Sequence, residues 1–155
     1  MLKIALGCDH GGLELKEDIF RYLKAEGYEV VDAGTSSQES CHYPVFGAAV
    51  GELVATRQCD FGIVVCTTCE GICMAVNKVK GARCGIGYNN DVARLMRQHN
   101  DANVISFGAK YTTAEEAFER IDIFLHTEFE GGRHQRRVGM IQEIERTGHL
   151  SPAES

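Results

Sequence analysis

The sequence predicts a doubly wound α/β fold, in which one parallel sheet of five strands carries helices on both faces. Two observations support this prediction. Five short apolar runs alternate with amphipathic stretches along the whole chain, and each crossover between parallel strands needs such a stretch, usually a helix. No internal repeat or low-complexity linker interrupts the 155 residues, so the alternation belongs to one domain.

Each expected strand is a short apolar run followed by a glycine or a polar residue. Glycines 34 and 108 close the second and fifth runs, and the run over 61–65 has the strongest strand character. In chain order, the expected strands are 4–6, 30–31, 61–65, 84–88 and 104–107. We expect the strand order 2-1-3-4-5, a Rossmann-like sheet whose switch point lies between the first and third strands.

Between these runs, apolar residues recur at the three- and four-residue spacing of a buried helix face. Gly27 supplies a stop for the first helix, and Pro44 suits the first turn of the second. In chain order, the expected helices carry 15–23, 44–53, 71–79, 90–99, 117–125 and 133–146. We therefore expect one domain over 1–147, including a C-terminal helix, and a flexible tail over 148–155.

The composition excludes several classes of protein. No apolar run approaches the ~20 residues that span a bilayer, and the net charge of -6 argues against general nucleic-acid binding. Only seven residues precede Cys8, which is too short for a lipoprotein signal. The seven cysteines form no disulfide framework, so we expect free thiols in a reducing cytoplasm.

Polar clusters follow the first and third expected strands. The first strand leads into Cys8-Asp9-His10-Gly11-Gly12, and the third into the segment from Cys66 to Gly71. Ligands of doubly wound sheets bind beyond the carboxyl ends of the strands at the switch point, where these two clusters should meet. The glycine spacing matches neither a dinucleotide fingerprint nor a Walker loop, so no nucleotide cofactor is expected. Asp9 has an alternative role as a simple helix cap.

Cys66 is the central candidate for chemistry. A cysteine between a strand and a helix N-terminus can act as a thiolate base or nucleophile, while Thr67 and Thr68 add hydroxyls beside it. Three alternatives remain open: an inert buried cysteine, a redox pair of Cys66 with Cys69, and a metal site. The metal site lacks a second ligand pair at recognisable spacing. Glu70 is either a base or a favourable charge at a helix N-terminus.

Two further clusters lie in the C-terminal half. His99 ends a helix of about ten residues that runs ~15 Å back to the opposite edge of the sheet, so a catalytic His99 must act in another subunit's site. Arg133 and Arg137 lie four residues apart on one helix face and can clamp a phosphate. The alternative for this pair is a solvated basic face.

These clusters resemble one family. From about residue 3 to 145 the chain resembles the type B ribose-5-phosphate isomerases and the related galactose-6-phosphate isomerase subunits. The resemblance rests on Gly7-Cys8-Asp9-His10, His42-Tyr43-Pro44, Ala75-Val76-Asn77-Lys78, the segment from Arg97 to Val104 and the segment from Glu130 to Val138. It implies a metal-independent aldose–ketose isomerase without a cofactor, working as a homodimer or homotetramer with sites shared across the subunit interface.

The resemblance also implies a role for each matching residue. Cys66 would be the base that moves a proton between C2 and C1. The loop amides from Thr67 to Gly71, helped by Asn100, would hold the enediolate. Asp9, Thr68 and His99 would position or open the furanose ring. His10, Arg133 and Arg137 would bind the phosphate.

The loop after Cys66 departs from the family pattern, which reads Cys-Gly-Thr-Gly-x-Gly. Here Thr67 and Cys69 replace two glycines, and Glu70 adds an acid. Side chains at 67 and 69 restrict the loop backbone and can narrow the pocket. Ribose 5-phosphate is the expected substrate. Another pentose or hexose phosphate, a requirement for a partner chain and the thiol redox function are the alternatives.

Overall fold

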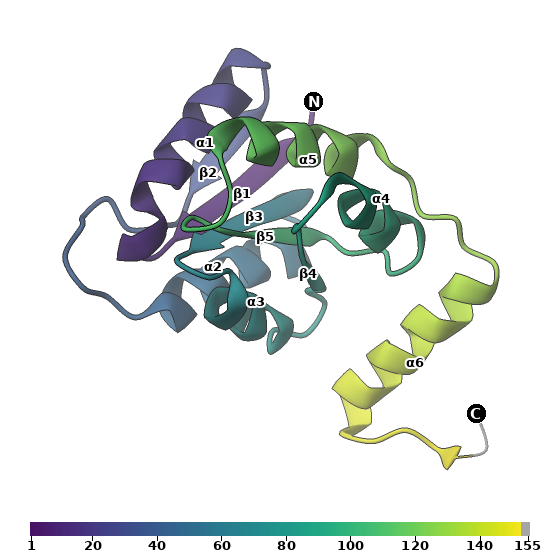
Figure 1. Ribbon diagram of the computed structural model, residues 1–155. Helices are drawn as coiled ribbons and strands as arrows, with labels where there is room; N and C mark the ends of the chain where they lie inside the picture. The colour runs from purple at the N-terminus through teal and green to yellow at the C-terminus, as the bar shows by residue number, and fades with distance from the viewer. Residues whose placement is uncertain (153–155) are drawn as a thin grey trace.

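The apolar runs form a single parallel sheet, with helices on both of its faces, in a computed structural model that describes residues 1–152 (Figure 1). The strands are β1 (Lys3–Cys8), β2 (Glu29–Asp32), β3 (Phe61–Cys66), β4 (Cys84–Ile86) and β5 (Val104–Gly108). The α-helices are α1 (Leu13–Ala25), α2 (Tyr43–Ala55), α3 (Glu70–Asn77), α4 (Asn90–Gln98), α5 (Ala114–His126) and α6 (Arg133–Thr147). A short 3₁₀ turn, His10–Gly12, precedes α1.

The strand order is β2-β1-β3-β5-β4, so the expected order 2-1-3-4-5 is wrong for the last two strands. β5 pairs with β3 from Gly62↔Val104 to Cys66↔Gly108, and β4 pairs only with β5. The cause lies in burial. All five residues of β5 are buried, whereas β4 has three half-buried residues instead of the five expected. A short, less buried strand suits the sheet edge, and a buried strand suits its interior.

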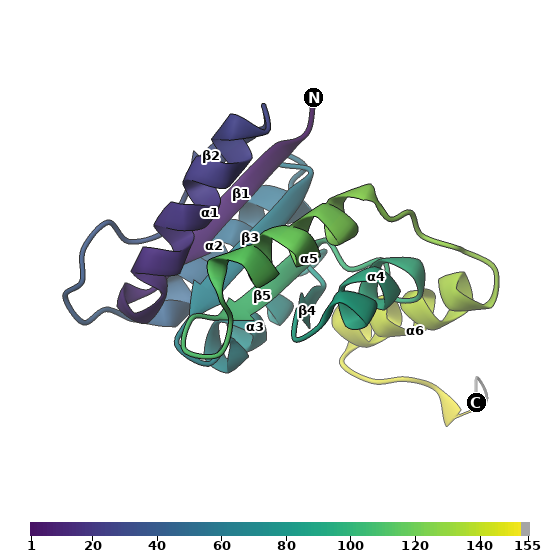
Figure 2. The same cartoon turned by 45° about the horizontal axis from the view of Figure 1, so that its top comes forward.

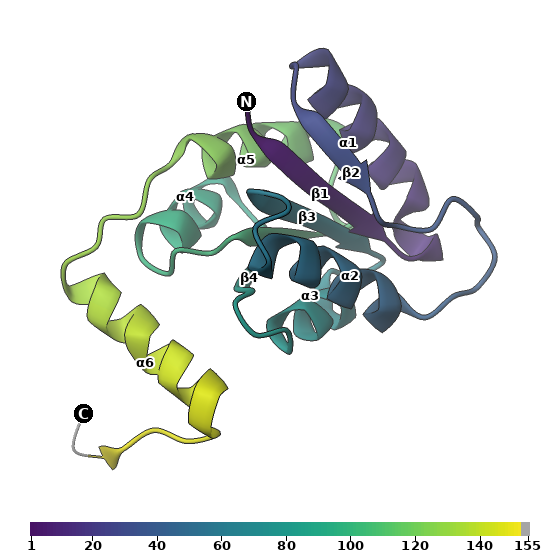
Figure 3. The same cartoon turned by 180° about the vertical axis from the view of Figure 1, so that it is seen from behind.

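Two hydrophobic clusters fill the space between the sheet and its helices. α1, α4 and α5 cover one face of the sheet (Figure 2). There, residues such as Ile19 and Phe124 pack against β-strand residues such as Ile63. α2 and α3 cover the other face (Figure 3). There, Val50 and Ile72 pack against Val64. α1 and α2 lie on opposite faces of the sheet. The strands are therefore added in one direction from β1 to β2 and in the other direction from β1 to β3. This switch point is where the sequence predicts it.

α6 covers neither face of the sheet (Figures 1 and 3). The segment 127–132 connects it to the end of α5, and it contacts the edge at which the strands begin. There the backbone N–H of Gly81 donates to the Glu145 carboxylate at 2.9 Å. Ile141 and Ile144 are 46% and 44% exposed. An amphipathic helix with its apolar residues in solvent is a candidate for contact with another chain.

The C-terminal helix ends a few residues before the last described residue, 152. α6 ends at Thr147, and Gly148 follows it with φ 85°, a conformation that favours glycine. The expected flexible tail, 148–155, lies partly outside the described residues. Among helices within 1–152, none combines the length and apolar character needed to cross a membrane.

Candidate active site

The two polar clusters expected at the switch point do meet there. Cys8 pairs with Val65 in the sheet, and the Asp9 N–H donates to the Val65 carbonyl at 3.3 Å. One turn later Gly11 lies against Thr67, and a Cβ at residue 11 would overlap the Thr67 hydroxyl. The glycine therefore lets the first cluster approach the loop after β3, as a shared site requires.

Asp9 and His10 are held differently. Asp9 is buried, and its Oδ1 accepts from the N–H groups of Gly11 at 3.0 Å and Gly12 at 3.2 Å. The capping role is therefore real, and Oδ1 alone makes both hydrogen bonds. His10 is half-buried, and its Nδ1 accepts from the Cys41 N–H at 3.2 Å, which links it to the loop before α2.

Cys66 is the last residue of β3 and is 5% exposed. Its carbonyl accepts from the Ala109 N–H at 2.9 Å, which fixes the strand end beneath the loop. Thr68 Oγ1 accepts from the Glu70 N–H at 3.4 Å, just before α3 begins. The first N–H groups of a helix have no partner inside it, so the start of α3 presents donors and a positive dipole end to the region beyond Cys66.

Cys69, which replaces a glycine of the family pattern, has an unfavourable backbone conformation. Its φ is 71°, a left-handed conformation that disfavours any residue with a Cβ. Its carbonyl accepts from the buried Ser106 hydroxyl at 2.9 Å. Because this hydrogen bond holds the loop in place, Cys69 keeps a backbone conformation that suits glycine. The loop path thus survives the substitution.

Gly71 lies in close contact with the ring of Tyr43. A Cβ there would lie 2.6 Å from the Tyr43 ring, so the first turn of α3 packs directly on that ring. Tyr43 starts α2 and is 42% exposed. The ring thus forms part of the wall above the loop. The His-Tyr-Pro motif marked this region, but the sequence alone does not show that the ring reaches Gly71.

Two thiols near Cys66, those of Cys69 and Cys8, have raised pKa values. Burial, helped by the neighbouring Glu70 carboxylate, raises the pKa of Cys69 to about 11. Burial also raises the pKa of Cys8, beneath the site, to about 12. Both groups therefore stay protonated at neutral pH, which weakens the redox interpretation of the Cys66–Cys69 pair. Glu70 is exposed and begins α3, so it suits the helix N-terminus.

A cavity of about 400 Å³ lies between α1 and the segment after β5, and Gly11, Thr67 and Lys110 contribute to its lining. Lys110 is a candidate anion-binding residue that sequence reasoning missed. Its N–H donates to the Thr67 carbonyl at 3.1 Å, because β5 lies next to β3. The expected strand order placed β4 there instead, so the residues after β5 seemed remote from the site.

His99 and Asn100 lie at the opposite edge of the sheet. β5 begins at Val104 beside Gly62 and ends beside Cys66, and its four steps span about 13 Å. His99 caps the end of α4 and precedes β5 by a short turn. As expected from the helix direction, His99 therefore cannot join Cys66 of its own chain.

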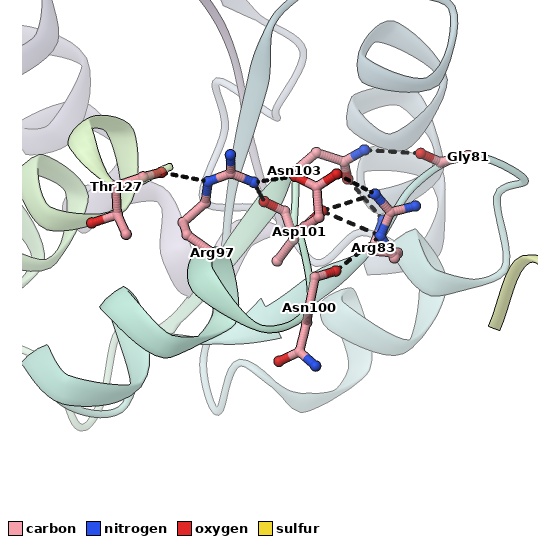
Figure 4. Close-up of polar contacts among 8 residues, drawn as sticks. Gly81, Arg83, Arg97, Asn100, Asp101, Asn103 and Thr127 are labelled. Carbon is pink, nitrogen blue, oxygen red and sulfur yellow. Dashed lines mark hydrogen bonds and ion pairs between the residues drawn. The ribbon is translucent and has the colours of Figure 1, made fainter. Parts of the chain in front are cut away.

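Two arginines hold the turn that presents His99 and Asn100 (Figure 4). Arg97 is buried and donates to Asp101 Oδ1 at 2.8 Å and to the Ala102 carbonyl at 2.6 Å. Arg83 donates to the carbonyls of Asn100 at 3.1 Å and Asp101 at 2.9 Å. The Asn100 side chain points away from this network (Figure 4). Arg97 is therefore structural, and Asn100 keeps its amide free for another contact.

The α6 cluster lies beside His99. Arg133 and Arg137 are both exposed, one turn apart. Between them in sequence, His134 is buried, and its ring stacks on that of His99 with centroids 4.2 Å apart. Burial, together with the nearby charge of His99, lowers the pKa of His134. Sequence reasoning did not include His134, although its place between the two arginines was visible.

The predicted site residues of one chain therefore fall into two separate groups, here called half-sites. The first group lies at the carboxyl edge of the sheet and consists of Asp9, His10, Cys66, Thr67, Thr68 and Gly71. The second group lies at the amino edge and on α6 and consists of His99, Asn100, Arg133 and Arg137. The first half-site offers a thiol, hydroxyls and helix N–H groups. The second offers an imidazole, an amide and two guanidiniums.

Comparison with known proteins gives one consistent result. A family model described as Ribose/Galactose Isomerase matches residues 4–141. The ribose-5-phosphate isomerase B of Escherichia coli strain K12 is 44% identical over 145 residues, which cover 94% of this chain and 97% of the relative.

Solved structures agree. The ribose-5-phosphate isomerase B of Clostridium thermocellum superposes with a TM-score of 0.93 at 47% identity, covering 96% of this chain and all of the other. The ribose-5-phosphate isomerase B of Mycoplasma genitalium, solved with bound ribulose 5-phosphate, superposes with a TM-score of 0.89 at 39% identity. The match covers 94% of this chain and 97% of the other.

Proposed function

Because this chain belongs to the ribose/galactose isomerase family, we propose that it interconverts ribose 5-phosphate and ribulose 5-phosphate. The observation that carries the proposal is the meeting of Asp9, Thr67 and Cys66 at the switch point, where Thr67 also lines a cavity of about 400 Å³. The names of the relatives support the substrate.

In the proposed reaction, the Cys66 thiolate takes the proton from C2 of the open aldose. The electron pair of that bond forms an enediolate across C1 and C2. The thiol then returns the proton to C1, while a hydroxyl proton moves from O2 to O1, and the ketose results. N–H groups at the start of α3 stabilise the negative charge that develops as the enediolate forms.

The remaining proposed roles divide between the two half-sites. Asp9 and Thr68 of one chain position the sugar, and His10 contacts the phosphate. A second copy brings His99 to open the furanose ring, Asn100 to contact the enediolate, and Arg133 and Arg137 to bind the phosphate. The separation of the half-sites supports this assembly, as do the exposed Ile141 and Ile144 on α6. We propose a homodimer, or a homotetramer built from it.

The alternatives have less support. The raised pKa and burial of Cys69 oppose a dithiol redox function. The described cysteines are all free, which supports placing the enzyme in the reducing cytoplasm. A hexose phosphate needs more room than a pentose phosphate, and Thr67 and Cys69 each add a side chain where the family pattern has glycine.

A direct assay tests the proposal. Purified chain is incubated with ribose 5-phosphate in D₂O, and NMR follows ribulose 5-phosphate and deuterium at C1. We expect ketose to form, with solvent deuterium entering at C1 because the thiol exchanges its proton. A chain that forms no ketose from ribose 5-phosphate, but converts galactose 6-phosphate or needs a partner protein, would contradict it.

A further inference from the structure

Three potential metal ligands come together where α4, the 127–132 segment and α6 meet. His134 Nε2 lies 3.5 Å from Glu130 Oε2, and the His134 ring stacks on His99 with an angle of 11° between the planes. One ligand atom from each of His99, Glu130 and His134 lies within 4.8 Å of the other two. Within residues 1–152, this is the only such group of three.

The surrounding backbone fixes these residues relative to one another. The Glu130 N–H donates to the Gln98 carbonyl at 3.1 Å, which ties the segment before α6 to the end of α4. The His134 N–H donates to the Gly131 carbonyl at 3.1 Å. Glu130 and His134 are four residues apart, and Arg97 holds the turn after His99. A ligand set spread over three segments is therefore brought together by the fold.

Two imidazoles and one carboxylate form a donor set that suits Zn²⁺, with a fourth position left for water or another ligand. Imidazole nitrogen donates its lone pair in the plane of the ring, so the stacked rings must turn before both bind one ion. Ligands around tetrahedral zinc are closer together than 4.8 Å, because each Zn–N bond is only about 2.0–2.1 Å long. The half-buried His99 and the exposed Glu130 have room for this contraction.

We propose that His99, Glu130 and His134 form a binding site for Zn²⁺ or a similar divalent transition metal, and that the bound metal inhibits the enzyme. Inhibition follows because a metal on His99 occupies the nitrogen that the sugar ring would use. This consequence rests on the proposed function, whereas the binding does not. The metal takes no part in turnover, so a chelator leaves the metal-free enzyme fully active.

Co²⁺ titration tests the binding, because cobalt is a spectroscopic substitute for zinc. We expect one ion per chain with visible d–d bands but without the near-ultraviolet charge-transfer band that thiolate ligands produce. This distinction matters because seven cysteines compete for soft metals. Glu130→Gln should weaken binding at least about tenfold, since even outer-shell changes cost 10–100-fold. Glu128→Gln, the same change on an exposed residue two positions away, should bind like the wild type.

The results separate the two parts of the proposal. Thiolate charge transfer, or equal affinity in Glu130→Gln and the wild type, would overturn the metal site. If the site binds as expected, Zn²⁺ should inhibit the wild type and the Glu128→Gln variant at lower concentrations than Glu130→Gln, and ribose 5-phosphate should protect. Metal bound at the site with turnover unchanged would contradict the role of His99. A chain without isomerase activity would remove the proposed function but leave the titration decisive.

Discussion

Gly11 lies so close to Thr67 that a methyl group on its α-carbon would overlap the Thr67 hydroxyl. The two residues belong to different strand ends, so this approach sets the width of the proposed site. It also makes the pair suitable for a double-mutant cycle.

We expect Gly11→Ala to lower the free energy of unfolding by about 1–3 kcal/mol, the usual cost of overpacking. In a Thr67→Ala background the overlapping oxygen is gone, so the same change should cost less, with a coupling of at least about 0.5 kcal/mol. Urea unfolding gives the free energy of unfolding of the wild type, the two single variants and the double variant. Gly139→Ala, where a Cβ meets nothing within 4 Å, is the control and should not destabilise. Additive effects of Gly11→Ala and Thr67→Ala on the free energy of unfolding would contradict this expectation. They would show that the loop carrying Thr67 shifts to make room for the added methyl group.

Cys66→Ala should lower kcat about 10²–10⁴-fold, the usual loss when a general base is removed. Binding of ribose 5-phosphate should persist, because the phosphate contacts are elsewhere. Steady-state kinetics and calorimetric binding measure the two effects. Cys69→Ala is the matched control and should change kcat little. Equal losses in both variants would favour the dithiol function over the thiolate base.

Cys69 should react slowly with iodoacetamide at neutral pH. Its pKa is raised from 9.0 to about 11, so its thiolate fraction keeps rising, about tenfold per pH unit, until the pH approaches 11. Mass spectrometry of the Cys69 peptide gives the rate at each pH. In urea-unfolded chain the same rate should level off near the ordinary thiol pKa. A native rate that levels off below pH 9 would show that Cys69 is more acidic than burial beside Glu70 allows.

Arg133→Ala and Arg137→Ala should each raise KM about 10- to 100-fold. Each removes charge-assisted hydrogen bonds worth roughly 1.5–3 kcal/mol, and neither arginine supports the hydrophobic clusters. Kinetics with ribose 5-phosphate and with free ribose measure the effect, and free ribose should be a very poor substrate for every variant. Arg146→Ala, near the other end of α6, should behave as the wild type. Similar turnover of ribose and its phosphate would refute the clamp.

Mixed assembly tests the shared site. Cys66→Ala and His99→Ala chains, each nearly inactive, are unfolded together and refolded. Half of a random dimer mixture is mixed, and each mixed dimer has one site without either lesion, so about a quarter of the wild-type activity should return. Each parent refolded alone is the control. Well-formed dimers with no regained activity would mean that His99 and Cys66 do not act across the interface.

Much of the fold is encoded locally, and the sequence therefore predicts it. Helix and strand positions follow from apolar spacing, and β1 and β3 end where the polar clusters begin. Strand order is different, because it depends on which run is buried on both faces. Nothing in the run over 84–88 reveals that the strand stops at Ile86 and lies at the edge.

The site follows the same division. Chain direction alone places Cys66 and His99 at opposite edges, because α4 must return before β5 begins. The contact of His134 with His99 and the approach of Lys110 to Thr67 depend on packing between distant segments. The second of these also depends on the strand order, so the error in order concealed it.

The placement of α6 has an evolutionary consequence. Both hydrophobic clusters are assembled from the sheet and α1 to α5, so the residues that stabilise the fold and the charged residues that α6 presents are separate sets. If Arg133 and Arg137 bind the phosphate as proposed, substitutions at these exposed positions can change which anion is preferred while the free energy of unfolding stays near its present value. Ligand preference can therefore diverge among descendants of this chain without a prior gain in stability.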